Sequence, residues 1–110
     1  KTKPIEKRQK IMEDVYQRGP LTVGYAVYQS FYNFFTQNPD GVYGDMVRPP
    51  NDRLIGGHAV NIVGWGTDPA SGVFYWLIRN SWGEAWGDNG YFKIQYDAEG
   101  ILDNVMGAEI

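Results

Sequence analysis

The sequence predicts an α+β fold in which an N-terminal helix precedes a mainly antiparallel β-sheet that curls towards a barrel. Apolar residues recur at helical spacing near the start of the chain, in a stretch that ends at a Gly-Pro pair. Most later segments are rich in branched and aromatic residues, or alternate apolar with polar ones, as strands do. Fourteen glycines and six prolines supply many turns, which favours a fold built largely of strands.

Composition limits the classes of partner. The 110 residues suffice for one domain, so residues 1–110 are expected to form a single unit. A hydrophobic content of 43% and an aromatic content of 15% are typical of a packed domain and not of a disordered chain. The net charge of −3 argues against a nucleic-acid partner. No apolar run approaches the ~20 residues of a membrane helix, so no membrane partner is expected either.

The metal-binding and redox residues are few. The chain has no cysteine and a single histidine, His58. Disulfides and thiolate metal sites are therefore excluded, and one histidine cannot build a zinc cluster. No metal and no cofactor is expected.

The first helix is expected to end at Gly19-Pro20, because glycine often terminates a helix and proline cannot continue one. Pro4 suits its first turn, and Glu6 is well placed for the helix dipole. The apolar stripe, which should pack on the sheet, consists of Ile11, Met12, Val15 and Tyr16 and is extended by Ile5.

Residues 21–28 are typical of a strand, and residues 28–35 either continue it or turn into a short helix. Six aromatic residues lie between positions 25 and 35. We interpret them as core, with a stacking platform for sugars or peptides as the alternative.

The remaining short elements are set by turn formers. Residues 38–41 form a turn that leads into a brief strand over 41–43, and residues 44–54 are expected to form an exposed loop. Near the end, residues 91–96 alternate as a half-buried strand does, and residues 105–110 are interpreted as a last edge strand.

A β-hairpin is predicted in the centre of the chain. Its strands are residues 58–65 and 73–80, and the loop that connects them is residues 67–72. Because the loop is centred on the midpoint between His58 and Asn80, these two residues are expected to oppose each other, with Cβ atoms ~4.5–5.5 Å apart. A hydrogen bond of ~2.7–3.2 Å can then join a ring nitrogen to the amide oxygen, whereas a slip of one residue would separate them.

Alternation along the hairpin gives one face that is apolar except at its end. His58 and Asn80 lie at that end, so the single histidine is expected beside an amide at the rim of a hydrophobic surface, as in a site. The residues predicted to share this face are His58, Val60, Ile62 and Gly64 on one strand and Phe74, Trp76, Ile78 and Asn80 on the other.

Four phrases resemble the C-terminal half of papain-family cysteine peptidases, in that family's order and spacing. They are Gly57-His58-Ala59-Val60, Gly64-Trp65-Gly66, Tyr75-Trp76-Leu77-Ile78-Arg79-Asn80-Ser81-Trp82-Gly83 and Trp86-Gly87-Asp88-Asn89-Gly90-Tyr91-Phe92. The paired glycines before the histidine look most like the cathepsin B branch, as does Gly41-Val42-Tyr43 upstream. The similarity covers nearly the whole chain.

The resemblance implies a role for the whole chain. In that family two domains meet at a cleft. One carries a nucleophilic cysteine, and the other, a barrel-like right-hand domain, carries a histidine and an asparagine. This chain would be the second domain, with the Cys-bearing N-terminal domain or chain as partner and a peptide or protein as substrate. The resemblance also implies a lysosomal, vacuolar or secreted location.

The resemblance implies roles for single residues too. His58 would pair with the thiolate and protonate the leaving amine, Asn80 would orient the ring, and Trp82 would shield their hydrogen bond and line the cleft. Gly57 and Ala59 would border the pocket for the substrate residue that precedes the scissile one. Asn104 would lie near the floor of that pocket, where some cathepsin B relatives have an acid.

The sequence departs from the family at Glu99, where a cysteine commonly precedes Gly-Ile, and in lacking the nucleophile and the oxyanion glutamine of the other domain. Ser81 is not expected to replace the nucleophile, since it follows Asn80 directly and no Gly-x-Ser-x-Gly elbow surrounds it. The chain by itself is therefore expected to be inactive.

Two functions follow from this. Either the chain is the His/Asn part of a cysteine peptidase whose cysteine lies elsewhere, or it is a non-catalytic papain-like module that binds a peptide or a partner. The presence of His58, Asn80 and Trp82 together favours the peptidase, because a binding module has no chemical need for all three. An unrelated carbohydrate binder is a third alternative.

Overall fold

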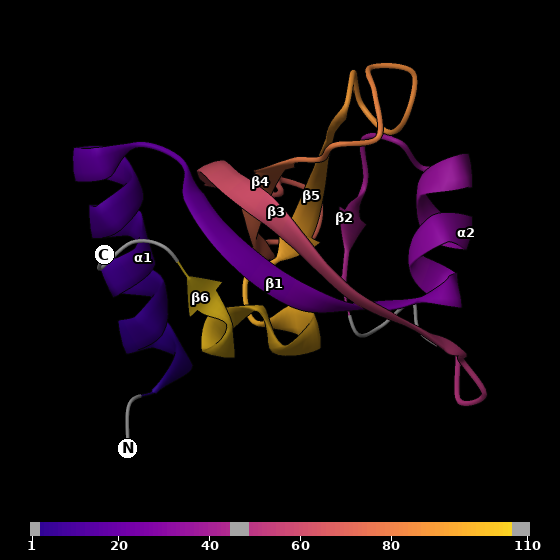
Figure 1. Ribbon diagram of the computed structural model, residues 1–110, viewed down its shortest axis with the longest axis horizontal. Helices are drawn as coiled ribbons and strands as arrows, with labels where there is room; N and C mark the ends of the chain where they lie inside the picture. The colour runs from indigo at the N-terminus through magenta and orange to yellow at the C-terminus, as the bar shows by residue number, and fades with distance from the viewer. Residues whose placement is uncertain (1–2, 45–48, 107–110) are drawn as a thin grey trace.

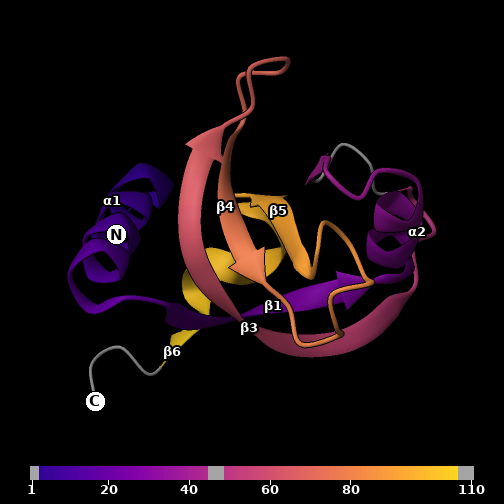
Figure 2. The ribbon, with the colours of Figure 1, turned by 90° about the horizontal axis from the view of Figure 1, so that it is seen from above.

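The described part of the protein consists of a helix, a curved six-stranded sheet and a second helix at one end of the sheet (Figures 1 and 2). The structure, a computed structural model, describes residues 3–44 and 49–106. The elements in chain order are α1 (Pro4–Arg18), β1 (Leu21–Tyr28), α2 (Gln29–Gln37), β2 (Val42–Tyr43), β3 (Leu54–Thr67), β4 (Phe74–Arg79), β5 (Tyr91–Gln95), the 3₁₀ segment η2 (Ala98–Asp103) and β6 (Val105–Met106).

The sheet has the order β2-β5-β4-β3-β1-β6. Neighbouring strands are antiparallel except β2 and β5, which run parallel. Strand β3 bends strongly, and the sheet curls with it (Figure 2). Within the described residues the edge strands β2 and β6 do not pair with each other, so the sheet is curled but not closed. The predicted α+β fold with a mainly antiparallel, curled sheet is confirmed.

Helix α1 packs on the sheet as predicted, but along a narrower stripe. Ile11 and Val15 are buried, and Met12 packs against the core at its edge. Tyr16 is 84% exposed and Ile5 is 48% exposed, so their inclusion in the stripe was wrong. For Tyr16 the reason is geometric: it lies about 100° around the helix from the buried Val15.

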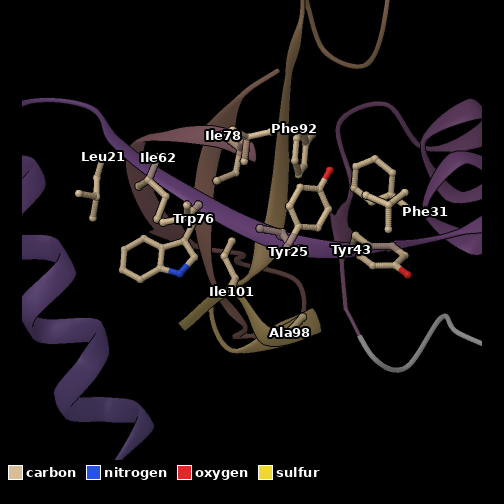
Figure 3. Close-up of a cluster of buried hydrophobic side chains, with 14 of the residues drawn as sticks. Leu21, Tyr25, Phe31, Tyr43, Ile62, Trp76, Ile78, Phe92, Ala98 and Ile101 are labelled. Atoms are coloured by element: carbon tan, nitrogen blue, oxygen red, sulfur yellow. The ribbon is translucent and has the colours of Figure 1, made fainter. Parts of the chain in front are cut away.

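Strand β1 supplies alternate residues to the core. Leu21, Val23, Tyr25 and Val27 are buried, whereas the residues between them are partly exposed. Figure 3 shows Leu21 and Ile62 near Trp76, and Tyr25 on the side of the core towards Phe31 and Phe92. The largest side chains that are fully buried are Trp76, Tyr43, Phe31, Phe92, Ile62, Ile78, Ile94, Ile101 and Val23.

Residues 29–37 form helix α2, so the helical alternative for this segment is correct. Its N-terminus is capped by the loop before β3: the Ser30 N–H donates to Asp52 Oδ1 at 3.0 Å, and the Gln29 N–H donates to Arg53 O at 2.9 Å. Phe31 and Phe35 on this helix are buried, as is Tyr25. The interpretation of the aromatic cluster as core is therefore confirmed for these three residues.

A polar network ties α2 to three other segments. The Ser30 hydroxyl donates to the Asp52 carboxylate and lies 2.9 Å from the Tyr43 hydroxyl, which in turn donates to Glu99 Oε2 at 3.0 Å. Burial raises the pKa of Tyr43 well above its usual range, so this phenol stays neutral. Glu99, the point where the tail departs from the papain-family pattern, thus links η2 to β2.

The β3–β4 hairpin forms, but two residues out of the predicted register. Ile62 opposes Ile78, where the prediction opposed it to Trp76. The loop closes where the Asp68 N–H donates to Val73 O at 2.9 Å, and a β-bulge after Ile62 adds one residue to β3. Loop closure and the bulge together account for the shift.

The shift has different consequences on the two sides of the bulge. Gly64 opposes Leu77 and so lies off the face predicted for it. Before the bulge, a displacement of two residues keeps every side chain on its predicted face. His58 and Asn80 therefore remain on the same side of the sheet, although β4 ends before it could oppose His58.

Two predictions fall partly outside the described residues. The last strand was predicted over residues 105–110, of which β6 accounts for Val105–Met106 and residues 107–110 are not described. The exposed loop predicted over 44–54 ends one residue early, because Leu54 already belongs to β3, and residues 45–48 are not described.

Candidate active site

His58 lies in the part of β3 that continues beyond the end of β4. Its backbone pairs with β1, where it directly opposes Tyr25, and its side chain is half-buried. The paired strand fixes the Cα position on one side, and the other edge of β3 is not covered by β4 at this point. The imidazole is thus anchored to the sheet and still accessible.

Asn80 follows the last residue of β4 and is 9% exposed. Its backbone N–H donates to Gly90 O at 3.0 Å, which fixes the residue against the glycine-rich turn. Its side-chain Oδ1 accepts a hydrogen bond of 2.8 Å from the Ser81 N–H. Because a backbone N–H can only donate, the atom facing Ser81 is the amide oxygen, and the orientation of the amide follows.

The same oxygen lies 2.9 Å from His58 Nε2, within the range predicted from the sequence. Since the Asn80 oxygen can only accept, Nε2 must carry a proton and donate it in this contact. In a neutral imidazole the unprotonated nitrogen is then Nδ1, which is free to face a reacting group. The predicted contact between His58 and Asn80 is present, although cross-strand opposition does not produce it.

Trp82 covers the imidazole. The two rings stack with centroids 5.0 Å apart and planes 20° from parallel. Trp82 is itself held by Tyr32 of α2, stacked at 5.4 Å, and by Trp86, which meets it edge-on at 4.9 Å. An indole against the imidazole excludes water from one side of the His58–Asn80 bond and attracts an imidazolium through its π face.

A surface pocket of about 580 Å³ opens beside His58. It is lined by the three residues predicted to belong to a substrate pocket, Gly57, Ala59 and Asn104. The pocket is also lined by residues that were not predicted: Gly24, Tyr25, Ala26, Leu54 and Gly56. The structure therefore brings all the predicted pocket residues together.

The pocket owes its space to small residues paired across two strands. Ala26 opposes Gly57, and Gly24 opposes Ala59, so little side-chain volume rises from this patch of the sheet. Asn104 enters from the segment after η2, held by a bond from the Gly24 N–H to its carbonyl oxygen at 2.9 Å. Its Nδ2 donates to Gly100 O at 2.7 Å, which leaves Oδ1 as the atom able to accept a hydrogen bond from a ligand.

Other chemistries find little support in the described part of the chain. There, no group of three or more His, Cys, Asp or Glu could hold a metal ion, and no helix is long and apolar enough to span a membrane. Ser81 is exposed, and among the hydrogen bonds of the described residues none joins its hydroxyl to His58. Ser81 is thus not placed to act as a nucleophile activated by His58.

The family profile described as "Papain family cysteine protease" matches residues 1–108. The chain belongs to this family. It is 44% identical over 85 residues to "Cathepsin B-like cysteine proteinase 3" of Caenorhabditis elegans, an alignment that covers 77% of this chain and 20% of that protein. It is 44% identical over 87 residues to "Cathepsin B-like protease 1" of Arabidopsis thaliana, which covers 79% of this chain and 21% of that protein.

Solved structures give the same family. Procathepsin B S9 from Trypanosoma congolense superposes with a TM-score of 0.67 at 28% identity over 87% of this chain and 29% of its own. Procathepsin L2 from the larval midgut of Tenebrio molitor gives 0.60 at 32% identity over 88% of this chain and 29% of its own. The papain-family, cathepsin B-like resemblance predicted from the sequence is confirmed. The chain spans about a fifth of the length of the curated relatives it matches.

Proposed function

We propose that residues 1–110 are the His/Asn-bearing domain of a cathepsin B-like cysteine peptidase that hydrolyses bonds in peptides or proteins. The nucleophilic cysteine would lie on an N-terminal domain or on a separate chain. The observation that carries this proposal is the 2.9 Å contact between His58 Nε2 and Asn80 Oδ1.

His58 is the proton-transfer group in this mechanism. With Nε2 occupied by Asn80, Nδ1 is the nitrogen that can pair with a thiol and take its proton. An imidazolium beside the sulfur lowers the thiol pKa from about 8.5 to about 3–4 in papain, so the reactive thiolate predominates at neutral pH. The thiolate attacks the substrate carbonyl, Nδ1–H protonates the amine as the C–N bond breaks, and water then hydrolyses the acyl-enzyme.

Asn80 and Trp82 support that step without transferring a proton. A neutral amide orients the ring without placing a negative charge near the thiolate, which a carboxylate would do. The indole of Trp82 keeps water from competing for the His58–Asn80 hydrogen bond.

The pocket beside His58 is proposed to bind the substrate residue that precedes the scissile one. Gly57 and Ala59 border it, and the free Oδ1 of Asn104 offers the pocket an uncharged acceptor. A lysosomal, vacuolar or secreted location is proposed for the whole protein. Relatives named "Gut-specific cysteine proteinase" and "digestive procathepsin" support the secreted alternative by similarity.

The test is reconstitution. The chain is mixed with a Cys-bearing N-terminal part of the same protein or of a cathepsin B-like relative, and release of a fluorogenic peptide amide is measured. Turnover should appear only in the mixture. His58→Ala should abolish it, and Asn80→Ala should reduce it less, because an orienting group is less indispensable than the proton donor. Ser81→Ala, at the exposed neighbour, is the matched control and should leave turnover unchanged.

Three results would overturn the proposal. One is hydrolysis by the purified chain with no thiol present, which would require a nucleophile in this chain. The second is full turnover by the His58→Ala mixture, and the third is a mixture that shows no turnover.

A further inference from the structure

Tyr25 is an aromatic neighbour of His58 that the proposed mechanism leaves without a role. It lies on β1 directly opposite His58 on β3, so the two side chains point to the same face. Their ring centroids are 5.9 Å apart with an interplanar angle of 61°, an edge-on arrangement. Tyr25 therefore meets the imidazole from a direction that neither Trp82 nor Asn80 occupies.

The tyrosine ring is held rigidly. It is 3% exposed and lies between Phe31 of α2 at 5.4 Å and Phe92 of β5 at 5.9 Å, both of which are fully buried. Figure 3 shows Tyr25 pointing from β1 towards these two rings. Because close-packed aromatic side chains leave no room for displacement, Tyr25 offers His58 a fixed surface.

The hydroxyl of Tyr25 does not explain why the residue is there. It is buried and has no hydrogen-bond partner among the described residues, which disfavours the folded state. Burial, reinforced by the nearby Tyr32 and Tyr43, raises the pKa of this phenol well above its usual range, so it is not an acid or base near neutral pH. The contribution of Tyr25 to His58 must come from the ring.

A fixed ring at this position restricts a motion that the other two contacts allow. Stacking on Trp82 permits the imidazole to slide and rotate within its own plane, and the bond to Asn80 permits it to swing about that bond. A third contact from the opposite strand blocks both motions. The two neighbours of Tyr25 along β1, Gly24 and Ala26, lie on the opposite face of the sheet and are too small to supply such a contact.

We propose that Tyr25 is a positioning residue whose aromatic ring, together with Trp82 and Asn80, confines the His58 imidazole to one orientation with Nδ1 presented to the thiol. The consequence of this positioning for catalysis rests on the proposed function. The orientation itself is a property of this chain alone, and it can be measured without turnover.

The first measurement is NMR spectroscopy of the chain with ¹⁵N-labelled histidine, at a pH where the imidazole is neutral. The wild type should show one protonated and one unprotonated ring nitrogen and nuclear Overhauser effects between the rings of Tyr25 and His58. Tyr25→Phe keeps the ring and should retain the single tautomer. Tyr25→Leu removes the ring, and the two nitrogen shifts should move towards each other as tautomers and orientations average.

Val23→Ala is the matched control, since Val23 is buried on the same face of β1 but opposes Val60. It should destabilise the chain and leave the His58 nitrogens as in the wild type. In a reconstituted peptidase Tyr25→Leu should lower kcat by about 10–100-fold with little change in KM, because a small misplacement of a reacting group costs that much.

Two outcomes overturn the proposal. One is a folded Tyr25→Leu chain that keeps the wild-type nitrogen shifts. The other, which needs no variant to fold, is a wild-type chain without Overhauser effects between the Tyr25 and His58 rings. If the NMR results are as expected but the mixture shows no turnover, the proposed function fails and the positioning of His58 by Tyr25 stands.

Discussion

The two halves of β3 differ in what holds them and in what they expose. Residues 61–67 pair with β4 except at the bulge residue Val63, and Ile62 within them is fully buried. Residues 54–60 pair only with β1, and four of them are exposed, Leu54, Ile55, Gly57 and Ala59, whereas Thr67 is the exposed residue of 61–67. His58 and the two glycines before it all lie in this second, more open half.

Strand β3 can therefore contribute both to stability and to chemistry. The first half, residues 61–67, is fixed by its pairing with β4 and, at Asn61 and Ile62, by pairing with β1 as well. The other half continues in the same direction with one free edge, so a side chain on it has a fixed backbone and open space around it. Substitutions in the first half should therefore change stability, and substitutions in the second should change function.

The largest expected effect is at Trp76 of β4, which pairs with the first half of β3. Trp76 opposes Trp65 and is 0% exposed, so Trp76→Ala should lower the free energy of unfolding by about 3–5 kcal/mol. Leu54→Ala, at a 57% exposed position of the open half, should change it by less than about 0.5 kcal/mol. Urea denaturation followed by circular dichroism measures both, and equal losses would remove the distinction between the halves.

The second effect concerns alkaline pH and involves Tyr25, which joins the open half to the core. Burial raises the pKa of Tyr25 and of Tyr43, whereas in the unfolded chain both phenols ionise near pH 10. Above pH 10 the unfolded state thus binds fewer protons than the folded state, and the free energy of unfolding should fall as pH rises.

Ultraviolet titration checks this expectation. Phenolate absorbance from these two residues should appear only together with loss of the folded-state circular dichroism, and Tyr43→Phe should reduce that late increment. Full ionisation of every tyrosine in a chain that is still folded would contradict the account of a tightly packed aromatic core.

The smallest effect on stability should accompany a clear effect on function. Ala59 is exposed on the open half and lines the pocket, so Ala59→Leu should alter the free energy of unfolding by less than about 0.5 kcal/mol. Its added side chain should occupy part of the pocket and raise KM for a peptide substrate in the reconstituted peptidase. Ala85→Leu, in the exposed loop after Trp82, is the control, and an equal KM for both variants would exclude a role for the pocket in substrate binding.

The sequence predicts the local elements of this protein well because their signals are local. Helix α1 ends at the Gly-Pro pair, and β1 covers the predicted residues 21–28. The hairpin register was missed because it depends on a bulge after Ile62 and on where the loop closes, neither of which alternation reveals. His58 and Asn80 still meet, because a register shift of two residues leaves both side chains on the same face of the sheet.

Three of the five pocket residues that the sequence does not predict come from a non-local pairing. Gly24, Tyr25 and Ala26 reach His58 only because β1 pairs with β3, and the two strands are separated by α2 and β2. The alternation of residues 21–28 shows that Tyr25 faces the core, but no signal in the sequence tells which strand lies beside it. A resemblance to a family supplied the pocket residues Gly57, Ala59 and Asn104 where pattern alone could not.

The central claim, that this chain supplies the imidazole of a thiol–imidazole pair, is tested most directly by the reactivity of the thiol. The rate at which iodoacetamide alkylates a Cys-bearing N-terminal part is measured at about pH 5.5, where an unpaired thiol of pKa about 8.5 is only ~0.1% thiolate. Adding this chain should accelerate alkylation by about 100-fold or more, and adding the His58→Ala chain should not. Equal rates with the two chains would contradict the account.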